Sequence, residues 1–244
     1  MQTNQRATVA DIAAGSLAAV RVFERLGIDY CCGGKRALAD VCRDKGLDEE
    51  GVQRELDAAT NAASAAARDW NSAPLRELVA HIVSTHHGYL KREFQPLTER
   101  LAKVYRVYNQ RYGEALIGLP EVFAGLRSEM EMHMMKEERM LFPAIVAAES
   151  ATESGAPLPQ TPFGTVGNPI RMMEAEHESA GGALASIRTI TRDFEIPDYA
   201  CVTYRALMNG LKEFEEDLHL HIHLENNILF PRAIELERAA AELI

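Results

Sequence analysis

The chain has 244 residues, of which 47% are hydrophobic and 25% are charged, and its formal net charge is −10. This composition is typical of a globular protein, and the length allows one domain of ordinary size with a small additional one. The negative charge, without a dense lysine and arginine cluster, argues against nucleic acid as a partner. No apolar run is long enough to span a membrane and the first residues are polar, so we expect no membrane partner and a cytoplasmic location.

Glycines divide the first part of the chain into short helical segments. The helical pattern of residues 8–56 is interrupted at Gly15, Gly27, Gly33, Gly34 and Gly46. An alanine-rich stretch at 58–67 then leads to Pro74, and Ser or Asn shortly before proline is a helix-start signal. We therefore predict a small helical double-cysteine domain with a linker at 1–70 and a second domain at 71–244.

Four long segments with helical periodicity follow. They cover residues 74–108, 120–149, 169–194 and 198–242. Asp198 and the Asn168-Pro169 pair are good helix starts, and the longest loop is expected at 150–167, which is rich in Pro, Gly, Ser and Thr. Strand patterns are weak throughout, so the predicted fold class is all-α.

An internal repeat is the most informative pattern in the chain. Residues 133–143 and 221–231 share the frame H-x3-E-x3-L-F-P, and a lone histidine precedes each copy on the helix before it. In the second half this histidine is His177, whereas the first half offers both His86 and His87. The repeat predicts two helical hairpins that pack as an antiparallel four-helix bundle.

Helical spacing places the repeat residues in the core. Residues four apart share a helix face, so each His-x3-Glu pair presents a nitrogen and an oxygen to one place. In the last segment the His-x3-Glu pair continues a seam, that is, a row of apolar residues with the spacing of a core-facing helix side. His219 and His223 lie off this seam, and we expect them to be solvated or near the ligands. The seam of the second segment is expected to continue through Met140. Two heptad lines on the first helix contain His86 and His87, and periodicity does not choose between them.

Four imidazoles and two carboxylates facing one core require compensating charge. An unpaired buried carboxylate costs several kcal/mol, comparable to the whole stability of a domain, and metal ions would neutralise it. Six protein ligands are too many for one four-coordinate zinc ion but suit two metals with bridging carboxylates and two imidazoles each. Nitrogen and oxygen donors without thiolate favour iron or manganese, although imidazole also accepts zinc or copper; we expect iron.

Four blocks of the sequence together resemble a known family. Residues 30–35 (YCCGGK), residues 176–181 and the two repeat blocks are similar to the bacterial iron-sulfur cluster repair di-iron proteins, a hemerythrin-like family. The resemblance covers residues 9–234 and implies a double-cysteine N-terminal domain before a hemerythrin-like four-helix bundle. It further implies two iron ions, oxo-bridged and held by four histidines and two bridging glutamates. It also selects His87 over His86. The implied metal ligands are His87, His133, Glu137, His177, His221 and Glu225.

The same resemblance implies a role in recovery from nitric oxide and oxidative stress. Damaged iron-sulfur proteins would be the partners, with repair by iron donation or by nitric oxide binding and reduction at the di-iron centre. The alternative is a hemerythrin-type protein that binds or senses nitric oxide or dioxygen without turnover. The sequence therefore leaves open whether the chain is an enzyme, and it does not decide whether the chain forms a homodimer.

Other polar and sulfur-containing side chains have their own expected roles. We expect Cys31 and Cys32, as accessible thiols, to help transfer iron, electrons or a nitrosyl group; the alternative is that the glycines after them only terminate a helix. Four cysteines, two of them adjacent, do not form the pattern of a secreted disulfide framework, so reduced thiols are expected.

Four glutamates and two further cysteines complete the set of expectations. Glu129 and Glu176, close to the predicted ligands, are candidates for relaying protons or guiding solvent to the metals. Glu131 and Glu138 are expected to be solvated. Cys42 and Cys201 are expected to be buried small residues.

Overall fold

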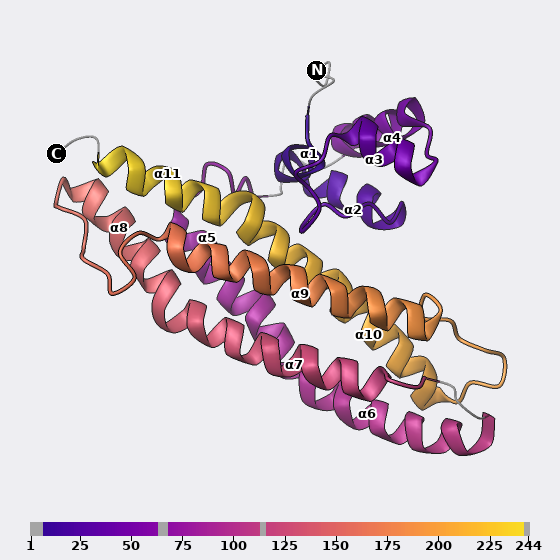
Figure 1. The fold of residues 1–244 in the computed structure, drawn as a ribbon. Coiled ribbons are helices and arrows are strands. Elements are labelled where there is room, and N and C mark those ends of the chain that lie inside the picture. The colour runs from indigo at the N-terminus through magenta and orange to yellow at the C-terminus, as the bar shows by residue number, and fades with distance from the viewer. Residues whose placement is uncertain (1–6, 63–67, 113–115, 242–244) are drawn as a thin grey trace.

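The computed structural model describes residues 7–62, 68–112 and 116–241. These residues form helices and one isolated bridge between Thr8 and Ala37, without a strand, which confirms the all-α class. A long bundle makes up most of the molecule, and a cluster of short helices lies against one side of it (Figure 1). Within the described residues no helix is both long and apolar enough to cross a membrane.

The N-terminal cluster contains four short helices, as the glycine pattern predicts. They are α1 (Val9–Gly15), α2 (Leu17–Arg25), α3 (Leu38–Lys45) and α4 (Glu49–Ala62). A capping box between Thr8 and Asp11 begins α1, and Gly46 ends α3 in the left-handed conformation at φ 65°. Because α2 already ends at Arg25, Gly33 and Gly34 lie in the turn between α2 and α3. The alternative interpretation of these two glycines as helix terminators is therefore wrong.

The bundle consists of four long rods. The first joins α5 (Leu75–His81), η1 (Ile82–His87) and α6 (Gly88–Tyr112); the second joins α7 (Leu119–Lys136), η2 (Glu137–Leu141) and α8 (Phe142–Ser154); the third is α9 (Gly167–Thr191); and the fourth joins α10 (Val202–Leu224), η3 (Glu225–Leu229) and α11 (Phe230–Ala241). α6 packs against α7 and α10, and α9 packs against the same two helices. The fourth rod begins later than expected, because Asp198 still lies in the preceding loop and Cys201 occupies the N-cap position.

Three of the rods contain a π-helical turn, named η1, η2 and η3 above. A π turn holds one more residue than an α turn, so it rotates the buried face of the helix that follows. Leu141 at the end of η2 and Phe142 directly after it are buried, whereas Met140 is 49% exposed, and the expected seam through Met140 is therefore wrong. In the first rod the buried line passes through Ile82 before the turn ends and through Leu90 after it. Of the two heptad lines on the first helix, the one that contains His86 is thus buried up to η1, and the one that contains His87 is buried after η1.

Two apolar clusters fill the bundle, one towards each end. The first includes Leu90, Met130 and Leu218 together with the core of the N-terminal helices. The second includes Ile82 and Ile228 and lies around α5, α8 and α11. On each rod the predicted metal ligands lie in the sequence between residues of the first cluster and residues of the second. The polar residues therefore sit where the two apolar clusters meet.

A carboxylate from α8 caps the first rod. Glu149 Oε1 accepts a hydrogen bond of 2.5 Å from the Leu75 amide, and Oε2 accepts one of 2.9 Å from the Arg76 amide. The first amides of a helix lack partners within it, and a negative charge at this end also interacts favourably with the positive end of the helix dipole. Glu149 thereby fixes the ends of the first two rods against each other.

We expect Glu149→Ala to lower the free energy of unfolding by about 1–3 kcal/mol, because the buried Leu75 amide and the half-buried Arg76 amide lose a carboxylate acceptor. Glu153→Ala is the matched control, since Glu153 pairs with Arg76 from an exposed position on the same helix and should change stability by less than about 1 kcal/mol. Chemical denaturation of both variants measures the difference. Equal effects would show that the amide cap contributes nothing beyond the ion pair.

Candidate metal centre

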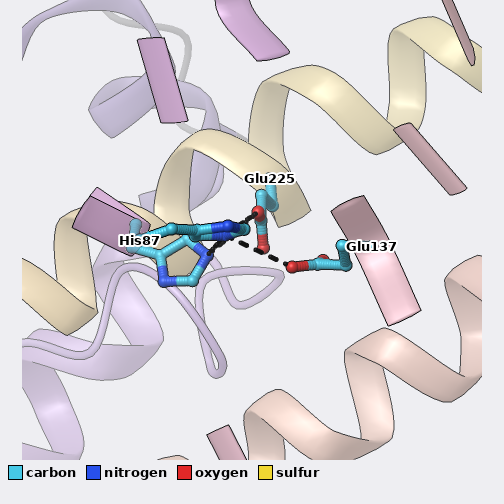
Figure 2. A group of neighbouring side chains, drawn as sticks. His87, Glu137 and Glu225 are labelled. Carbon is cyan, nitrogen blue, oxygen red and sulfur yellow. Dashed lines mark hydrogen bonds and ion pairs between the residues drawn. The ribbon is translucent and has the colours of Figure 1, made fainter. Parts of the chain in front are cut away.

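Six side chains from all four rods converge in the middle of the bundle, and each is fully buried at 0% exposure. This six-residue cluster contains His87, His133, Glu137, His177, His221 and Glu225. His87 ends η1, and Glu137 and Glu225 begin η2 and η3, so the π turns lie at the cluster itself. Figure 2 shows the His87 ring facing the carboxylates of Glu137 and Glu225, which come from different rods.

The imidazoles of the cluster form two facing pairs. The Nε2 atoms of His87 and His221 are 3.2 Å apart, and those of His133 and His177 are 3.0 Å apart. Each pair, with Glu137 and Glu225, forms a group of four residues that could hold a metal ion. Both carboxylates belong to both groups, so the two groups lie side by side and share Glu137 and Glu225.

The buried atoms of the cluster fit bound cations. Within the described part of the chain, both carboxylate oxygens of Glu137 are buried without a hydrogen-bond partner. A buried unpartnered oxygen costs about 1–3 kcal/mol, more when it is charged, so natural proteins rarely keep one without compensation. A neutral imidazole has only one N–H donor, so a ring that donates from Nδ1 presents a bare Nε2 lone pair to the cluster. A cation between the imidazoles and the carboxylates would accept these lone pairs and compensate the unpartnered oxygens.

The electrostatics of the protein without metal lead to the same conclusion. Burial lowers the pKa of His87, but the Glu137 and Glu225 carboxylates outweigh it and raise that pKa to about 9. For His133, burial is likewise outweighed, chiefly by Glu137, and its pKa rises to about 10. Burial favours the neutral form of Glu225, yet the neighbouring imidazoles, led by His221, hold its pKa well below the usual range. The carboxylates thus stay charged and recruit positive charge into the core.

Three of the four imidazoles have a partner on their outer nitrogen. His87 Nδ1 lies 2.8 Å from Glu138 Oε1, and His133 Nδ1 lies 2.9 Å from Glu176 Oε2. Glu176 is thus where its sequence position suggested, beside the ligands. Glu138 was expected to be solvated, which is wrong, since His87 and Lys91 both donate to it. Such outer partners fix the tautomer and direct Nε2 towards the cluster.

The third outer partner is Asn226, whose Oδ1 lies 2.8 Å from His177 Nδ1. Glu138 and Asn226 each directly follow a glutamate of the cluster, so both belong to the same position of the repeat. Alignment of the two repeat copies could therefore have identified them from the sequence. The two halves differ in charge here, because one outer partner is a carboxylate and the other a neutral amide.

The extra histidines lie outside the cluster. His86 Nδ1 is 2.9 Å from Asp217 Oδ1, and its ring stacks 6.1 Å from that of His221. The structure thus brings His87, and not His86, together with the other five residues. His223 is fully buried against Tyr30, with ring centroids 5.5 Å apart, so the expectation that it is solvated or near the ligands is wrong. Helical periodicity describes one buried face, whereas α10 is covered on two sides.

The remaining predicted residues lie away from the cluster. Glu129 is exposed and accepts a hydrogen bond of 3.0 Å from Ser179, so it is a surface residue in this structure. Cys42 is buried as expected, at 1% exposure. Cys201 is exposed, which contradicts its predicted burial, because it lies at the N-terminal end of α10 and not within the helix.

The turn that carries Cys31 and Cys32 reaches the cluster from the N-terminal domain. Asp29 Oδ1 accepts hydrogen bonds from the amides of both cysteines, at 3.1 and 2.9 Å. The Cys32 sulfur lies 3.5 Å from the carbonyl oxygen of His177, and Asn226 Nδ2 donates to the Cys31 carbonyl over 3.3 Å. Asn226 therefore links this double-cysteine turn (residues 29–34) to an imidazole of the cluster.

Comparison with known proteins identifies the family of this chain. Residues 78–233 match the hemerythrin HHE cation binding domain, and residues 5–60 match a domain of unknown function, DUF542. The iron-sulfur cluster repair protein YtfE of Dickeya chrysanthemi is 38% identical over 90% of this chain and 92% of its own length. This chain belongs to the YtfE family. A YtfE relative from Citrobacter koseri is 37% identical over 87% of this chain and 90% of its own length.

We expect Asn226→Ala to weaken iron binding about 10- to 100-fold, because His177 loses the partner that orients its ring. Asn227→Ala is the matched control, since Asn227 donates to the Tyr30 carbonyl over 2.8 Å but does not contact the cluster. Competition with an iron chelator measures both variants. Equal weakening in the two would indicate that docking of the N-terminal domain, and not orientation of His177, is what matters.

Proposed function

We propose that the six-residue cluster is the metal site of the protein and binds two iron ions, one at each pair of facing imidazoles. Glu137 and Glu225 would bridge the two ions, and an oxo bridge would complete the centre. The observation that carries this proposal is that both groups of four contain the same two carboxylates. Nitrogen and oxygen donors without thiolate suit iron, and the match to a cation binding domain supports a metal role.

The centre would serve the repair of iron-sulfur clusters damaged by nitric oxide or oxidative stress. Relatives that are 37–38% identical over 87–90% of this chain are named as iron-sulfur cluster repair proteins. Damaged iron-sulfur proteins would then be the partners, with nitric oxide or dioxygen as small ligands. When bound, the iron pair would supply iron for a damaged cluster or electrons for the reduction of nitric oxide.

The chain's own residues support this role in three ways. The carboxylates keep their charge in the core and thereby hold cations there. Glu138, Glu176 and Asn226 orient three of the imidazoles. The apolar clusters on either side exclude water, which strengthens the electrostatic interactions of the site.

The N-terminal domain at 1–70 would add the contact with the partner, through the double-cysteine turn. In this division the domain at 71–244 holds the metals. Thiols that are free in the structure suit a reducing compartment such as the cytoplasm.

Glu137→Ala tests the metal site and the repair role together. We expect it to lower both iron content and reactivation of a damaged iron-sulfur enzyme at least about 10-fold, because Glu137 contributes to both groups of four. Glu131→Ala is the control, since Glu131 is exposed near the same helix end and pairs with Arg127 over 2.9 Å. Normal repair by an iron-free Glu137→Ala protein would exclude the proposal. Iron binding without any repair would favour the alternative role in gas binding or sensing.

A second variant tests the thiols. If the double-cysteine turn transfers iron, electrons or a nitrosyl group, Cys31→Ser/Cys32→Ser should lower cluster repair about 10-fold or more while the bundle keeps its iron, because the sulfurs lie outside the six-residue cluster. Iron content and enzyme reactivation are measured on the same preparation, with Cys42→Ser as the control. Full retention of repair would remove the thiols from the proposed function.

A further inference from the structure

The double-cysteine turn contains a second group of metal-binding atoms. The Cys31 and Cys32 sulfurs are 3.8 Å apart, and the Cys31 sulfur is 3.5 Å from Asp29 Oδ1. One donor atom from each of these three residues lies within 4.8 Å of the other two. Both thiols are free. The group is separate from the six-residue cluster and shares no ligand with it.

Two of the separations, 3.8 Å between the sulfurs and 3.5 Å between the Cys31 sulfur and Asp29 Oδ1, match those of a tetrahedral metal site. With metal–sulfur bonds of about 2.3 Å and metal–oxygen bonds of about 2.1 Å, tetrahedral angles place two sulfurs about 3.8 Å apart and a sulfur and an oxygen about 3.6 Å apart. Without a metal, the same distances are those of hydrogen bonds from a thiol to Asp29 Oδ1 and between the two sulfurs. Binding of a metal would replace these hydrogen bonds with bonds from the metal to all three donor atoms.

Asp29 is held in place by the backbone of the turn. Its Oδ1 accepts the amides of Cys31 and Cys32, and its Oδ2 accepts the Gly33 amide over 2.9 Å. The conformation is tight, because a Cβ at Gly34 would lie 2.5 Å from the Tyr30 carbonyl oxygen. The carboxylate and the two sulfurs are therefore positioned before any ion binds, which lowers the entropic cost of binding.

The turn lies between solvent and the buried cluster. It lines a cleft of about 960 Å³ between the N-terminal domain and the bundle, together with Gly181, Gly182 and His219. On its other side, Cys32 lies against the His177 carbonyl and Cys31 is joined to His177 through Asn226. A β-carbon at Gly181 would lie 3.4 Å from the Cys32 sulfur, so glycine leaves space around this thiol.

We propose that Asp29, Cys31 and Cys32 form a separate site for a divalent transition-metal ion, with ferrous iron as the physiological occupant. Binding would form two metal–sulfur bonds and one metal–oxygen bond, and the two thiol protons would pass to solvent. No electron is transferred in this step. The fourth position would face the cleft, open to water or to a ligand atom of a partner protein. The choice of iron rests on the proposed function, whereas the existence of the site does not.

Cobalt(II) added to the reduced, iron-loaded protein tests the site, because thiolate bound to cobalt gives a charge-transfer absorption that imidazole and carboxylate do not. We expect this absorption to saturate at one cobalt ion per chain and to be absent in Cys31→Ser/Cys32→Ser. Asp29→Asn keeps an oxygen that accepts amide hydrogen bonds but removes the charge. It should weaken cobalt binding about 10- to 100-fold. The cysteine control is Cys42→Ser, which should behave as the unchanged protein.

Two further variants separate the possible failures. Cys32→Ser alone guards against misfolding at the buried Cys31, and circular dichroism of every variant checks the fold. Glu137→Ala should keep the thiolate absorption, so loss of the bundle centre and loss of the turn site are distinguished. Absence of thiolate absorption in the reduced unchanged protein, or its survival in Cys31→Ser/Cys32→Ser, would overturn the proposal.

Discussion

The structure depends on the burial of two carboxylates among four imidazoles at the centre of a helical bundle. Glu137 and Glu225 are fully buried, and both oxygens of Glu137 lack a hydrogen-bond partner among the described residues. Burial of this kind normally destabilises a protein by several kcal/mol unless opposite charge is close. The facing imidazoles provide part of that charge, and cations would provide the rest. The apolar clusters on either side make this requirement strict, because water is kept out.

The π-helical turns meet the geometric part of the same requirement. A continuous α-helix rotates by a fixed angle per residue, so its buried face drifts slowly around the helix axis along its length. Ligands at the centre and apolar residues on both sides of them would then not all face the core. One additional residue at η1, η2 and η3 corrects that register at the ligands. The correction explains why Met140 is exposed while Leu141 and Phe142 are buried. Such turns are frequent at functional sites.

The two hairpins are similar in sequence but not in their surroundings. Glu138 and Asn226 occupy the same repeat position, yet one is a carboxylate paired with Lys91 and the other is an amide bonded to the double-cysteine turn. The half of the cluster that contains His177 is therefore in contact with the N-terminal domain. Asn226 touches both His177 and Cys31, so two hydrogen bonds connect an imidazole of the cluster to the double-cysteine turn.

The sequence alone determined the helical class, the paired hairpins and the core-facing position of two His-x3-Glu motifs, because these follow from spacing within helices and from the internal repeat. It did not determine the choice between His86 and His87, since helical periodicity is interrupted where η1 inserts a residue. Burial of His223 and the contact of Glu138 with His87 also arise only in three dimensions, because they depend on which elements pack side by side. Tertiary structure likewise placed the double-cysteine turn, distant in sequence, against His177. Contacts between distant segments leave no periodic signal in the chain.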